Sequence, residues 1–188
     1  MIEISEYIEI NGIKQYVLIT GNENGPLMLF LHGGPGVSQI GFIRKYQSKL
    51  EKKFLVVNWD QRGAGKSNIK KFSRKELTID NIINDAISLI KILRERFKKT
   101  HVYLIGHSFG SLIGIILAQK IPQYIKVYIS VGQVVNINEA DKVTYKLLSQ
   151  KIKKENNKKG INILKKIGKP PYVTKDSIRN LDKLIEKY

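Results

Sequence analysis

Short, continuous runs of apolar residues, separated by segments with helical periodicity, most constrain the fold of this chain. Three such runs cover residues 27–31, 54–59 and 102–105. A strand that is apolar along its whole length is typical of a parallel sheet with both faces covered. Residues 78–97 lie between the second and third runs and carry apolar residues at a helical spacing, with Thr78 as a favourable N-cap. This alternation predicts a mostly parallel sheet with helices on both faces.

The same pattern extends on both sides of these runs. Asn11-Gly12 separates two apolar-rich segments, residues 8–10 and 13–20, and this dipeptide predicts a β-hairpin near the N-terminus. A helix is expected from about Phe109 to Lys120, and a further strand over residues 127–131. The strand–helix alternation therefore continues through the first two thirds of the chain.

The character of the sequence changes after Val135. The remainder is polar, rich in lysine and asparagine, and has helical periods, with a Gly-Lys-Pro-Pro break at 168–171 before a last helix near 177–188. We therefore expect two parts, a core over residues 1–135 and a helical appendage over residues 136–188.

Composition excludes several classes of protein. The chain has no cysteine, which rules out disulfides, thiolate chemistry and thiolate metal sites. Its N-terminus is acidic and alternating, unlike a signal peptide, and its longest apolar stretches are far too short to span a bilayer. We expect a cytoplasmic protein with no membrane partner.

The formal net charge of +17 raises the question of a nucleic-acid partner. The lysines are scattered over surface-type positions and become denser after Asp141, where they are interleaved with asparagine, isoleucine and leucine at helical spacing. No basic stripe with interleaved aromatic residues is present. The pattern favours a solvated lysine-rich face, so we expect no nucleic-acid partner.

The segment Gly106-His107-Ser108-Phe109-Gly110 lies directly after a predicted strand and before a predicted helix. A sharp strand-to-helix turn holds such a serine with its hydroxyl projecting above the sheet. The two glycines are expected where neighbouring backbone leaves no room for a Cβ. The N-terminus of the following helix offers free N–H groups to a developing oxyanion. The pattern therefore predicts Ser108 as a nucleophile.

Two glycine-rich loops follow other predicted strands. In His32-Gly33-Gly34-Pro35-Gly36, the glycine pair lets backbone N–H groups point at a substrate carbonyl, opposite the N–H of Phe109. The other loop, Asp60-Gln61-Arg62-Gly63-Ala64-Gly65-Lys66-Ser67, ends like a phosphate-binding P-loop. Asp60 stands where that motif needs its first glycine, and a carboxylate there would repel phosphate, which argues against nucleotide binding.

Taken together, the three motifs resemble those of the proline iminopeptidase (prolyl aminopeptidase) family of α/β-hydrolases, in order and in spacing, over roughly residues 8–135. The resemblance implies the α/β-hydrolase fold, with the start of a helical cap after the core. It also implies a substrate that is a peptide or a small amide or ester, acyl transfer through an acyl-enzyme, and no metal or other cofactor. Family members release an N-terminal residue, typically proline, from peptides.

By the same resemblance, Ser108 is the nucleophile, and the N–H groups of Phe109 and of Gly33 or Gly34 form the oxyanion hole. The remaining motif residues are implied to be structural supports. These are His32, Pro35, Gly36, Asp60, Arg62, Gly106, His107 and Gly110.

The general base is not evident from the sequence. In this fold the triad runs serine, acid, histidine along the chain, yet no histidine follows Ser108. His101 opens the strand that Ser108 follows, roughly 20 Å away along seven extended residues, and His107 lies inside the turn, where its side chain is directed away from the hydroxyl. Glu139 or Asp141 could supply the triad acid. The acid of a triad orients the histidine, however, so without a histidine it has no catalytic role.

The resemblance places both missing triad members beyond Tyr188, on final strands that this chain lacks. We therefore expect residual catalysis, about 10³ to 10⁴ over water, and an open edge at the strand over 127–131 that favours self-association. Two alternatives stay open: a hydrolase-derived protein that binds a ligand or partner without turnover, and an α/β-hydrolase that acts on other amides or esters.

Overall fold

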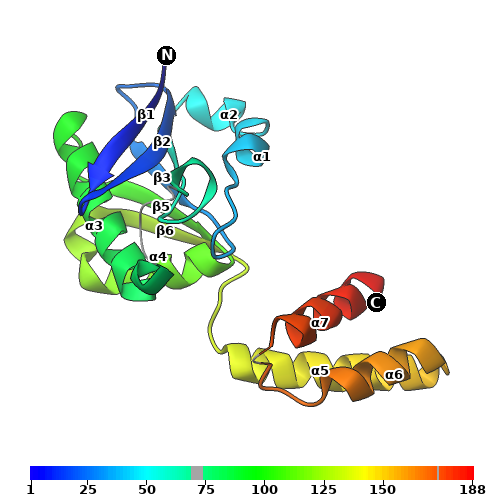
Figure 1. The fold of residues 1–188 in the computed structure, drawn as a ribbon. Coiled ribbons are helices and arrows are strands. Elements are labelled where there is room, and N and C mark those ends of the chain that lie inside the picture. Colours follow the sequence, from blue (N-terminus) through cyan, green and yellow to red (C-terminus); the bar gives the residue numbers. More distant parts are fainter. Residues whose placement is uncertain (69–73, 173) are drawn as a thin grey trace. The chain divides into compact units, whose positions relative to one another are not determined.

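The computed structural model describes residues 1–68, 74–172 and 174–188. These residues form two compact units, Met1–Val134 and Val135–Tyr188, which are described separately below. The first unit contains a sheet with helices and the second contains helices (Figure 1).

Six strands form one sheet in the described part of the first unit, in the order β1-β2-β4-β3-β5-β6. The strands β4, β3, β5 and β6 are parallel to one another, and the β1–β2 hairpin joins β4 in antiparallel orientation. The sheet is therefore mostly parallel, as predicted. The bounds of the strands are β1 Ile2–Ile10, β2 Ile13–Gly21, β3 Leu27–Leu31, β4 Leu55–Trp59, β5 Val102–His107 and β6 Ile125–Val131.

The hairpin turns at Asn11 and Gly12, which have φ angles of 49° and 78°. Two positive φ values in succession match the twist of the flanking strands and suit asparagine and glycine. The first strand begins at Ile2 and not at Ile8 as predicted. Its residues alternate between an exposed face, which includes Glu3 and Ser5, and a partly buried face whose isoleucines pack against the core. Apolar content alone underestimates an edge strand of this kind.

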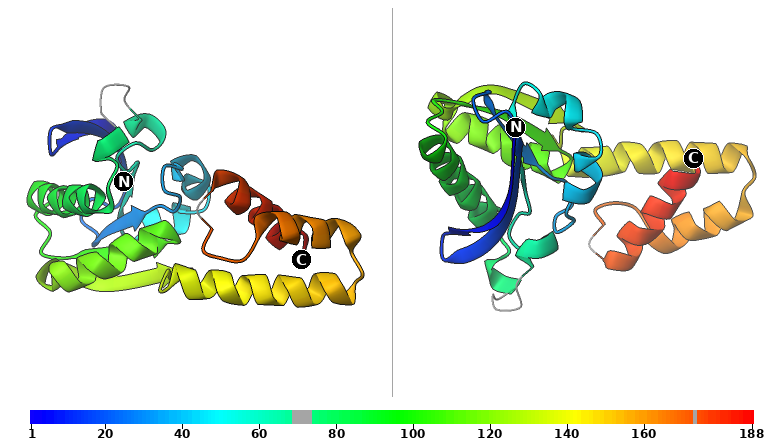
Figure 2. Two further views of the ribbon diagram at one scale, coloured as in Figure 1. Left: turned by 60° about the horizontal axis from the view of Figure 1, so that its bottom comes forward. Right: turned by 90° about the horizontal axis from the view of Figure 1, so that it is seen from above.

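Helices cover both faces of the sheet (Figures 1 and 2). The helices α3 (Ile79–Arg96) and α4 (Phe109–Lys120) pack on the face that carries the odd-numbered residues of β3. On the opposite face, α1 (Ile40–Arg44) and α2 (Ser48–Glu51) follow β3. Gln47, just before α2, exchanges two side-chain hydrogen bonds with Asn58 of β4, at 2.8 and 3.1 Å, which ties α2 to the sheet.

The short helices α1 and α2 were not predicted, because helices of five and four residues show no apolar period. The bounds of α3 and α4 agree with the prediction, and the Thr78 hydroxyl caps α3 by accepting a hydrogen bond from the N–H of Asn81 at 3.1 Å. The described part of this unit also contains 3₁₀ turns at Gly65–Ser67, Arg74–Glu76 and Pro122–Tyr124.

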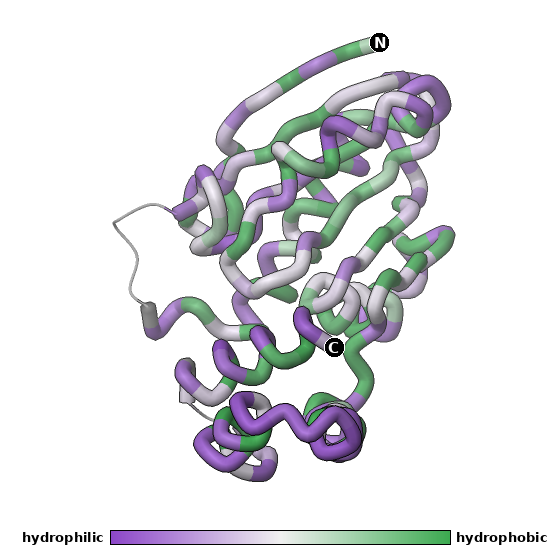
Figure 3. Tube along the Cα trace, turned by 90° about the vertical axis from the view of Figure 1, so that its right-hand side faces the viewer, coloured by the Kyte–Doolittle hydropathy of each residue, from purple (hydrophilic) through white to green (hydrophobic). Residues whose placement is uncertain are grey.

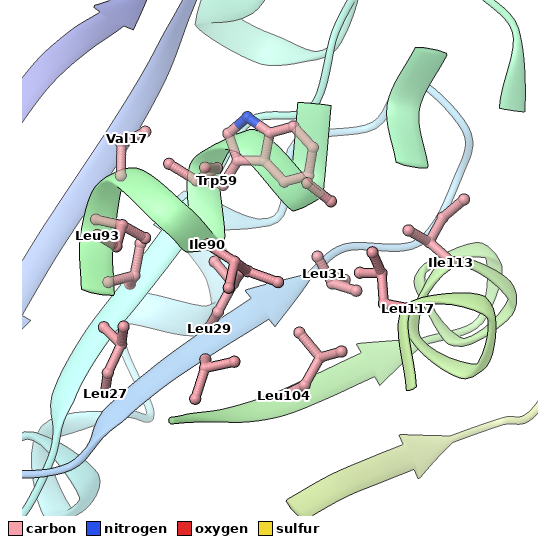
Figure 4. Packing of buried hydrophobic residues seen from close by; sticks show 14 of the residues in the cluster. Val17, Leu27, Leu29, Leu31, Trp59, Ile90, Leu93, Leu104, Ile113 and Leu117 are labelled. Atoms are coloured by element: carbon pink, nitrogen blue, oxygen red, sulfur yellow. The ribbon is translucent and has the colours of Figure 1, made fainter. Parts of the chain in front are cut away.

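The core of the first unit lies between the sheet and the α3–α4 layer (Figure 4). Leu27, Leu29 and Leu31 of β3 are almost fully buried there, and Ile90 and Leu93 of α3 pack over them. The odd-numbered side chains of β3 thus lie in this core, while the even-numbered ones lie on the opposite face of the sheet, which carries α1 and α2. This burial on both faces explains why the central strands have no polar alternation.

Strand β6 lies at one end of the strand order, and among the described strands it pairs with β5 alone. Val127, Ile129 and Val131 are 39–49% exposed on one face of this strand. An edge strand with exposed apolar side chains favours pairing with another chain. Self-association through this edge stays a prediction.

Helices α5 (Ile137–Lys154), α6 (Lys158–Ile167) and α7 (Lys175–Lys187) form the second unit. Each begins at an N-cap whose side chain accepts a backbone N–H: Asn136, Asn157 and Thr174 respectively. A small apolar core, which includes Ile152 and Leu184, holds the helices together, while their outer surface is hydrophilic (Figure 3). In the described ranges, no helix is sufficiently long and apolar to cross a membrane.

Candidate active site

Ser108 occupies the turn between β5, which ends at His107, and α4, which begins at Phe109. Its φ and ψ angles are 51° and −119°. This region is costly for a residue with a Cβ and persists only where the surroundings enforce it. The N–H of Ser108 donates to the carbonyl oxygen of Val131, at the end of β6, at 2.9 Å. The strained serine is therefore held by the neighbouring strand.

The glycines on either side of Ser108 are required by close backbone contacts. A Cβ on Gly106 would lie 2.6 Å from the carbonyl oxygen of Gly110, one turn later. A Cβ on Gly110 would lie 2.1 Å from the carbonyl oxygen of Leu31 and 2.8 Å from that of His32. The start of α4 therefore packs directly on the loop that follows β3, as the glycine-rich motifs predict.

The predicted oxyanion loop lies against Ser108. A Cβ on Gly33 would lie 3.1 Å from the Cβ of Ser108, and Gly34, with φ +123°, follows immediately. Phe109 is the first residue of α4, whose N-terminus carries partial positive charge and N–H groups without intrahelical partners. The fold thus brings both predicted sources of oxyanion donors close to the serine. Pro35 and Gly36 continue the loop.

Both ring nitrogens of His32 are engaged in hydrogen bonds. Nε2 accepts the backbone N–H of Gln61 at 3.0 Å, and Nδ1 lies 2.7 Å from the carbonyl oxygen of Gly33. Because Nε2 is an acceptor, the proton belongs on Nδ1, which donates to Gly33. The Gln61 side chain also donates to the carbonyl oxygen of His32 at 2.9 Å. A neutral, buried His32 therefore links the oxyanion loop to the loop after β4.

Burial lowers the pKa of His32 below its ordinary value of 6.5, and this desolvation outweighs the opposing effects of the Gly33 carbonyl and the Asp60 carboxylate. The unfolded chain therefore takes up the His32 proton at a higher pH than the folded chain does. The resulting contribution to stability is complete above about pH 6.5 and decreases as the pH falls through the lower, folded-state value.

We expect the free energy of unfolding to fall with decreasing pH below 6.5, with His32 contributing at most about 1.4 kcal/mol per pH unit. Urea unfolding at a series of pH values measures this slope. His32→Gln is expected to have a shallower slope than the native chain. Equal slopes for the two proteins would contradict the assignment.

The other two histidines have hydrogen-bond partners other than Ser108. The exposed side chain of His107 accepts a hydrogen bond at Nδ1 from the Gln39 side-chain amide at 3.0 Å. His101 precedes β5, whereas Ser108 follows it, so the two lie at opposite ends of the strand. Its Nδ1 lies 2.9 Å from the Thr100 hydroxyl. None of the three histidines, all of which lie within the described residues, forms a hydrogen bond with the Ser108 hydroxyl.

Asp60 organises the loop after β4. Its Oδ2 accepts the backbone N–H of Lys66 at 2.9 Å, and its carbonyl oxygen accepts the Ser67 hydroxyl at 2.6 Å. The buried Ser67 hydroxyl accepts in turn from the N–H of Tyr16 at 2.7 Å, while the Lys66 ammonium lies 4.2 Å from the centre of the Tyr16 ring. The apparent P-loop ending thus anchors this loop to β2.

Arg62 forms a buried, bidentate ion pair with Asp85 of α3, with both N–O distances at 2.8 Å. These hydrogen bonds raise the pKa of the guanidinium above its ordinary value. Asp85 also accepts from the side-chain amides of Asn11 at 2.8 Å and Gln15 at 2.6 Å. Sequence reasoning missed Asp85. The signal that could have revealed it is the position of this carboxylate among apolar residues on the inner face of a helix, where a buried charge needs a partner.

Ser111 is a second residue to which the sequence alone assigned no role. Its buried hydroxyl donates to the carbonyl oxygen of Ser108 at 2.5 Å and accepts the N–H of Val134 at 2.9 Å. The Tyr128 hydroxyl lies 2.7 Å from the Ser111 carbonyl oxygen. Ser111 therefore ties the turn around Ser108 to the segment after β6.

The predicted acid candidates, Glu139 and Asp141, lie on α5 in the second unit. The carboxylate of Glu139 pairs there with the Lys142 ammonium at 2.7 Å. Across the residues that the structure describes, histidine, aspartate and glutamate do not gather in a group of three that could hold a metal ion.

A mostly parallel sheet with helices on both faces, and a strained serine between a strand and a helix, define the α/β-hydrolase class. A family model described as the alpha/beta hydrolase fold matches residues 26–159. The chain belongs to this family, and the predicted fold class is confirmed.

The relatives confirm the resemblance to proline iminopeptidases. A probable aminopeptidase of Bacillus subtilis, YbaC, is 39% identical over 96% of this chain and 56% of that protein. A proline iminopeptidase of Thermoplasma volcanium is 28% identical over 80% of this chain and 50% of that protein. The chain thus spans about half the length of these curated relatives.

Solved structures support the same fold. A proline iminopeptidase-related protein of Thermus thermophilus superposes with a TM-score of 0.69, at 22% identity, over the whole chain and 57% of that structure. An epoxide hydrolase of Vigna radiata superposes with a TM-score of 0.58, at 29% identity, over 68% of this chain and 39% of that structure. Proteins named for different activities share the fold, so the fold alone does not define the substrate.

Proposed function

We propose that this chain carries the nucleophile and the oxyanion donors of a serine hydrolase of the proline iminopeptidase type. The strained backbone of Ser108, with φ 51° at the junction of β5 and α4, is the observation that carries the proposal. Its hydroxyl attacks the substrate carbonyl, and the N–H groups of Phe109 and of Gly33 or Gly34 stabilise the tetrahedral oxyanion. His32, Asp60 and Arg62 hold the surrounding loops.

The substrate proposed is a peptide whose N-terminal residue, typically proline, forms an acyl-enzyme on Ser108. The names of the aminopeptidase and proline iminopeptidase relatives support this substrate class. The general base is proposed to come from outside the 188 residues, because both nitrogens of His32 are engaged, His101 lies at the far end of β5, and His107 is bound to Gln39. A cytoplasmic location is proposed as well.

The proposal is tested by reaction with a fluorophosphonate probe, followed by intact and peptide mass spectrometry. We expect one label per chain, located on Ser108, and formed slowly because the hydroxyl lacks its base. Ser108→Ala is expected to abolish the label, while Ser5→Ala, at an exposed serine on β1, is expected to keep it. A label that maps to another residue, or that survives in Ser108→Ala, would contradict the proposal.

Turnover of a fluorogenic proline amide separates this function from its main alternative, a hydrolase-derived protein that binds a ligand or partner without catalysis. The placement of the three histidines favours weak activity of the 188 residues by themselves, near the residual level of about 10³ to 10⁴ over water. Hydrolysis that Ser108→Ala abolishes would exclude the non-catalytic alternative. If esters are hydrolysed and the proline amide is not, the hydrolase acts on other substrates.

A further inference from the structure

A cavity of about 330 Å³ lies beside the oxyanion loop in the first unit. Its wall comes from segments that are far apart in the sequence: the oxyanion loop, the loop after β4, the entry to α3 and the start of α4. The apolar part of the wall and the adjoining loop backbone consist of Pro35, Gly36, Leu77, Ile79, Ile82 and Phe109.

The cavity adjoins the two segments that carry the proposed oxyanion donors. Phe109 lines it and also supplies the proposed oxyanion N–H, while Pro35 and Gly36 line it and directly follow Gly34. A carbonyl group whose oxygen is bound between Phe109 and Gly34 therefore has its substituents next to the cavity. Since Ser108 attacks that same carbonyl carbon, the acyl substituent stays close to this wall throughout the reaction.

The outer wall of the cavity consists of apolar side chains that remain in contact with water. Leu77 and Ile79 are each 45% exposed, although both are large hydrophobic residues, and Ile82 is buried behind them. Apolar surface in a concave site gains stability when a ligand removes it from water. A volume of about 330 Å³ is near the lower end for ligand sites, which suits a single small apolar group.

Building on the proposed role of Ser108, we propose that this cavity is an acyl-group subsite in which Leu77 and Ile79 determine specificity. It takes a small apolar group attached to the scissile carbonyl. The corresponding substrates are amides or esters with an acyl group of a few carbon atoms, in preference to acetyl groups. Leu77 and Ile79 contact the acyl chain and take no part in the chemical step.

The test compares acylation of the purified chain by p-nitrophenyl acetate, butyrate and hexanoate. The rate of p-nitrophenolate release and the mass of the acylated protein both report the step in which the Ser108 oxygen bonds to the acyl carbon and p-nitrophenolate leaves. We expect the acylation rate to increase by up to about fourfold for each methylene that the cavity buries.

Leu77→Gln and Ile79→Gln replace half-exposed apolar side chains with polar ones of similar length. Each is expected to lower the hexanoate-to-acetate rate ratio toward one. Leu77→Trp is expected to do the same by filling the cavity. The matched control is Ile115→Gln, at a residue on α4 that is 36% exposed and does not line the cavity; its rate ratio is expected to equal that of the native chain. If none of the cavity variants changes the hexanoate-to-acetate rate ratio, the cavity is not the acyl-group subsite.

A second measurement does not depend on Ser108. Hexan-1-ol is titrated into the protein while the methyl NMR signals of Leu77 and Ile79 are followed, and saturable shifts at these methyls are expected in both native protein and Ser108→Ala. If no ester acylates Ser108 but the shifts occur, the proposed function fails and the cavity remains an apolar subsite. If Ser108 is acylated equally by all three esters and no shifts occur, the subsite alone is overturned.

Discussion

Asp85→Ala is expected to lower the free energy of unfolding of the first unit by about 3–5 kcal/mol. The substitution leaves the Arg62 guanidinium buried without its carboxylate, and it removes the acceptor of the Asn11 and Gln15 side-chain amides. An uncompensated buried charge costs far more than a lost surface contact. Trp59 is the only tryptophan and donates to Gln15 at 3.0 Å, so its fluorescence during urea unfolding measures the loss.

Two further variants show whether the buried charge is the cause. The double substitution Arg62→Met with Asp85→Leu removes both charges together, and we expect it to recover most of the stability that Asp85→Ala loses. Glu3→Ala removes an ion pair with Arg44 in which both side chains are at least half exposed, so it is expected to cost no more than about 1 kcal/mol. A native unfolding midpoint for Asp85→Ala would show that the pair contributes little.

Gly110→Ala is expected to have the second large effect, on stability and on Ser108 together. The added Cβ would lie 2.1 Å from the carbonyl oxygen of Leu31, which is backbone and cannot rotate away. The start of α4 must move away from the oxyanion loop, which separates the N–H of Phe109 from those of Gly33 and Gly34. Because the contact is with backbone, we expect a loss at the upper end of the usual overpacking cost, about 3 kcal/mol in the free energy of unfolding, and loss of fluorophosphonate labelling.

Gly41→Ala is the matched control for this substitution. Gly41 lies in α1, a Cβ there would meet nothing within 4 Å, and its φ angle is not positive. Alanine is favoured over glycine in a helix by up to about 1 kcal/mol, so native or slightly higher stability and native labelling are expected. Urea unfolding and mass spectrometry of both variants give the comparison. If Gly110→Ala keeps native labelling, the packing of α4 on the oxyanion loop is not needed for the reactivity of Ser108.

Much of the fold was predictable because its signals are local. Residues 27–31 form β3 within the predicted bounds, since a strand buried on both faces must be apolar at every position. The Asn11-Gly12 turn and the Thr78 cap were likewise visible, because each depends on one or two neighbouring residues. Helices α1 and α2 were not predictable, because four or five residues are too few to show a period.

The residues of the candidate site also differ in whether a local sequence signal could reveal them. Ser108 and its flanking glycines could be assigned from five consecutive residues, because the turn itself requires them. Asp85 could not, because its partners at positions 11, 15 and 62 are 23 to 74 residues away along the chain. The state of His32 depends in the same way on Gln61, which is 29 residues away.

The sequence by itself therefore determined the alternation of the sheet strands with the long helices α3 and α4, and it predicted Ser108 as the nucleophile. It also shows that no histidine follows Ser108 within the 188 residues. These features follow from local backbone geometry and from burial, which are set by adjacent residues. Only the tertiary structure decided which polar groups neutralise one another, that His32 is a neutral support, and that Leu77 and Ile79 line a cavity beside the oxyanion loop. Such contacts form when the sheet brings distant loops together, and no local pattern specifies them.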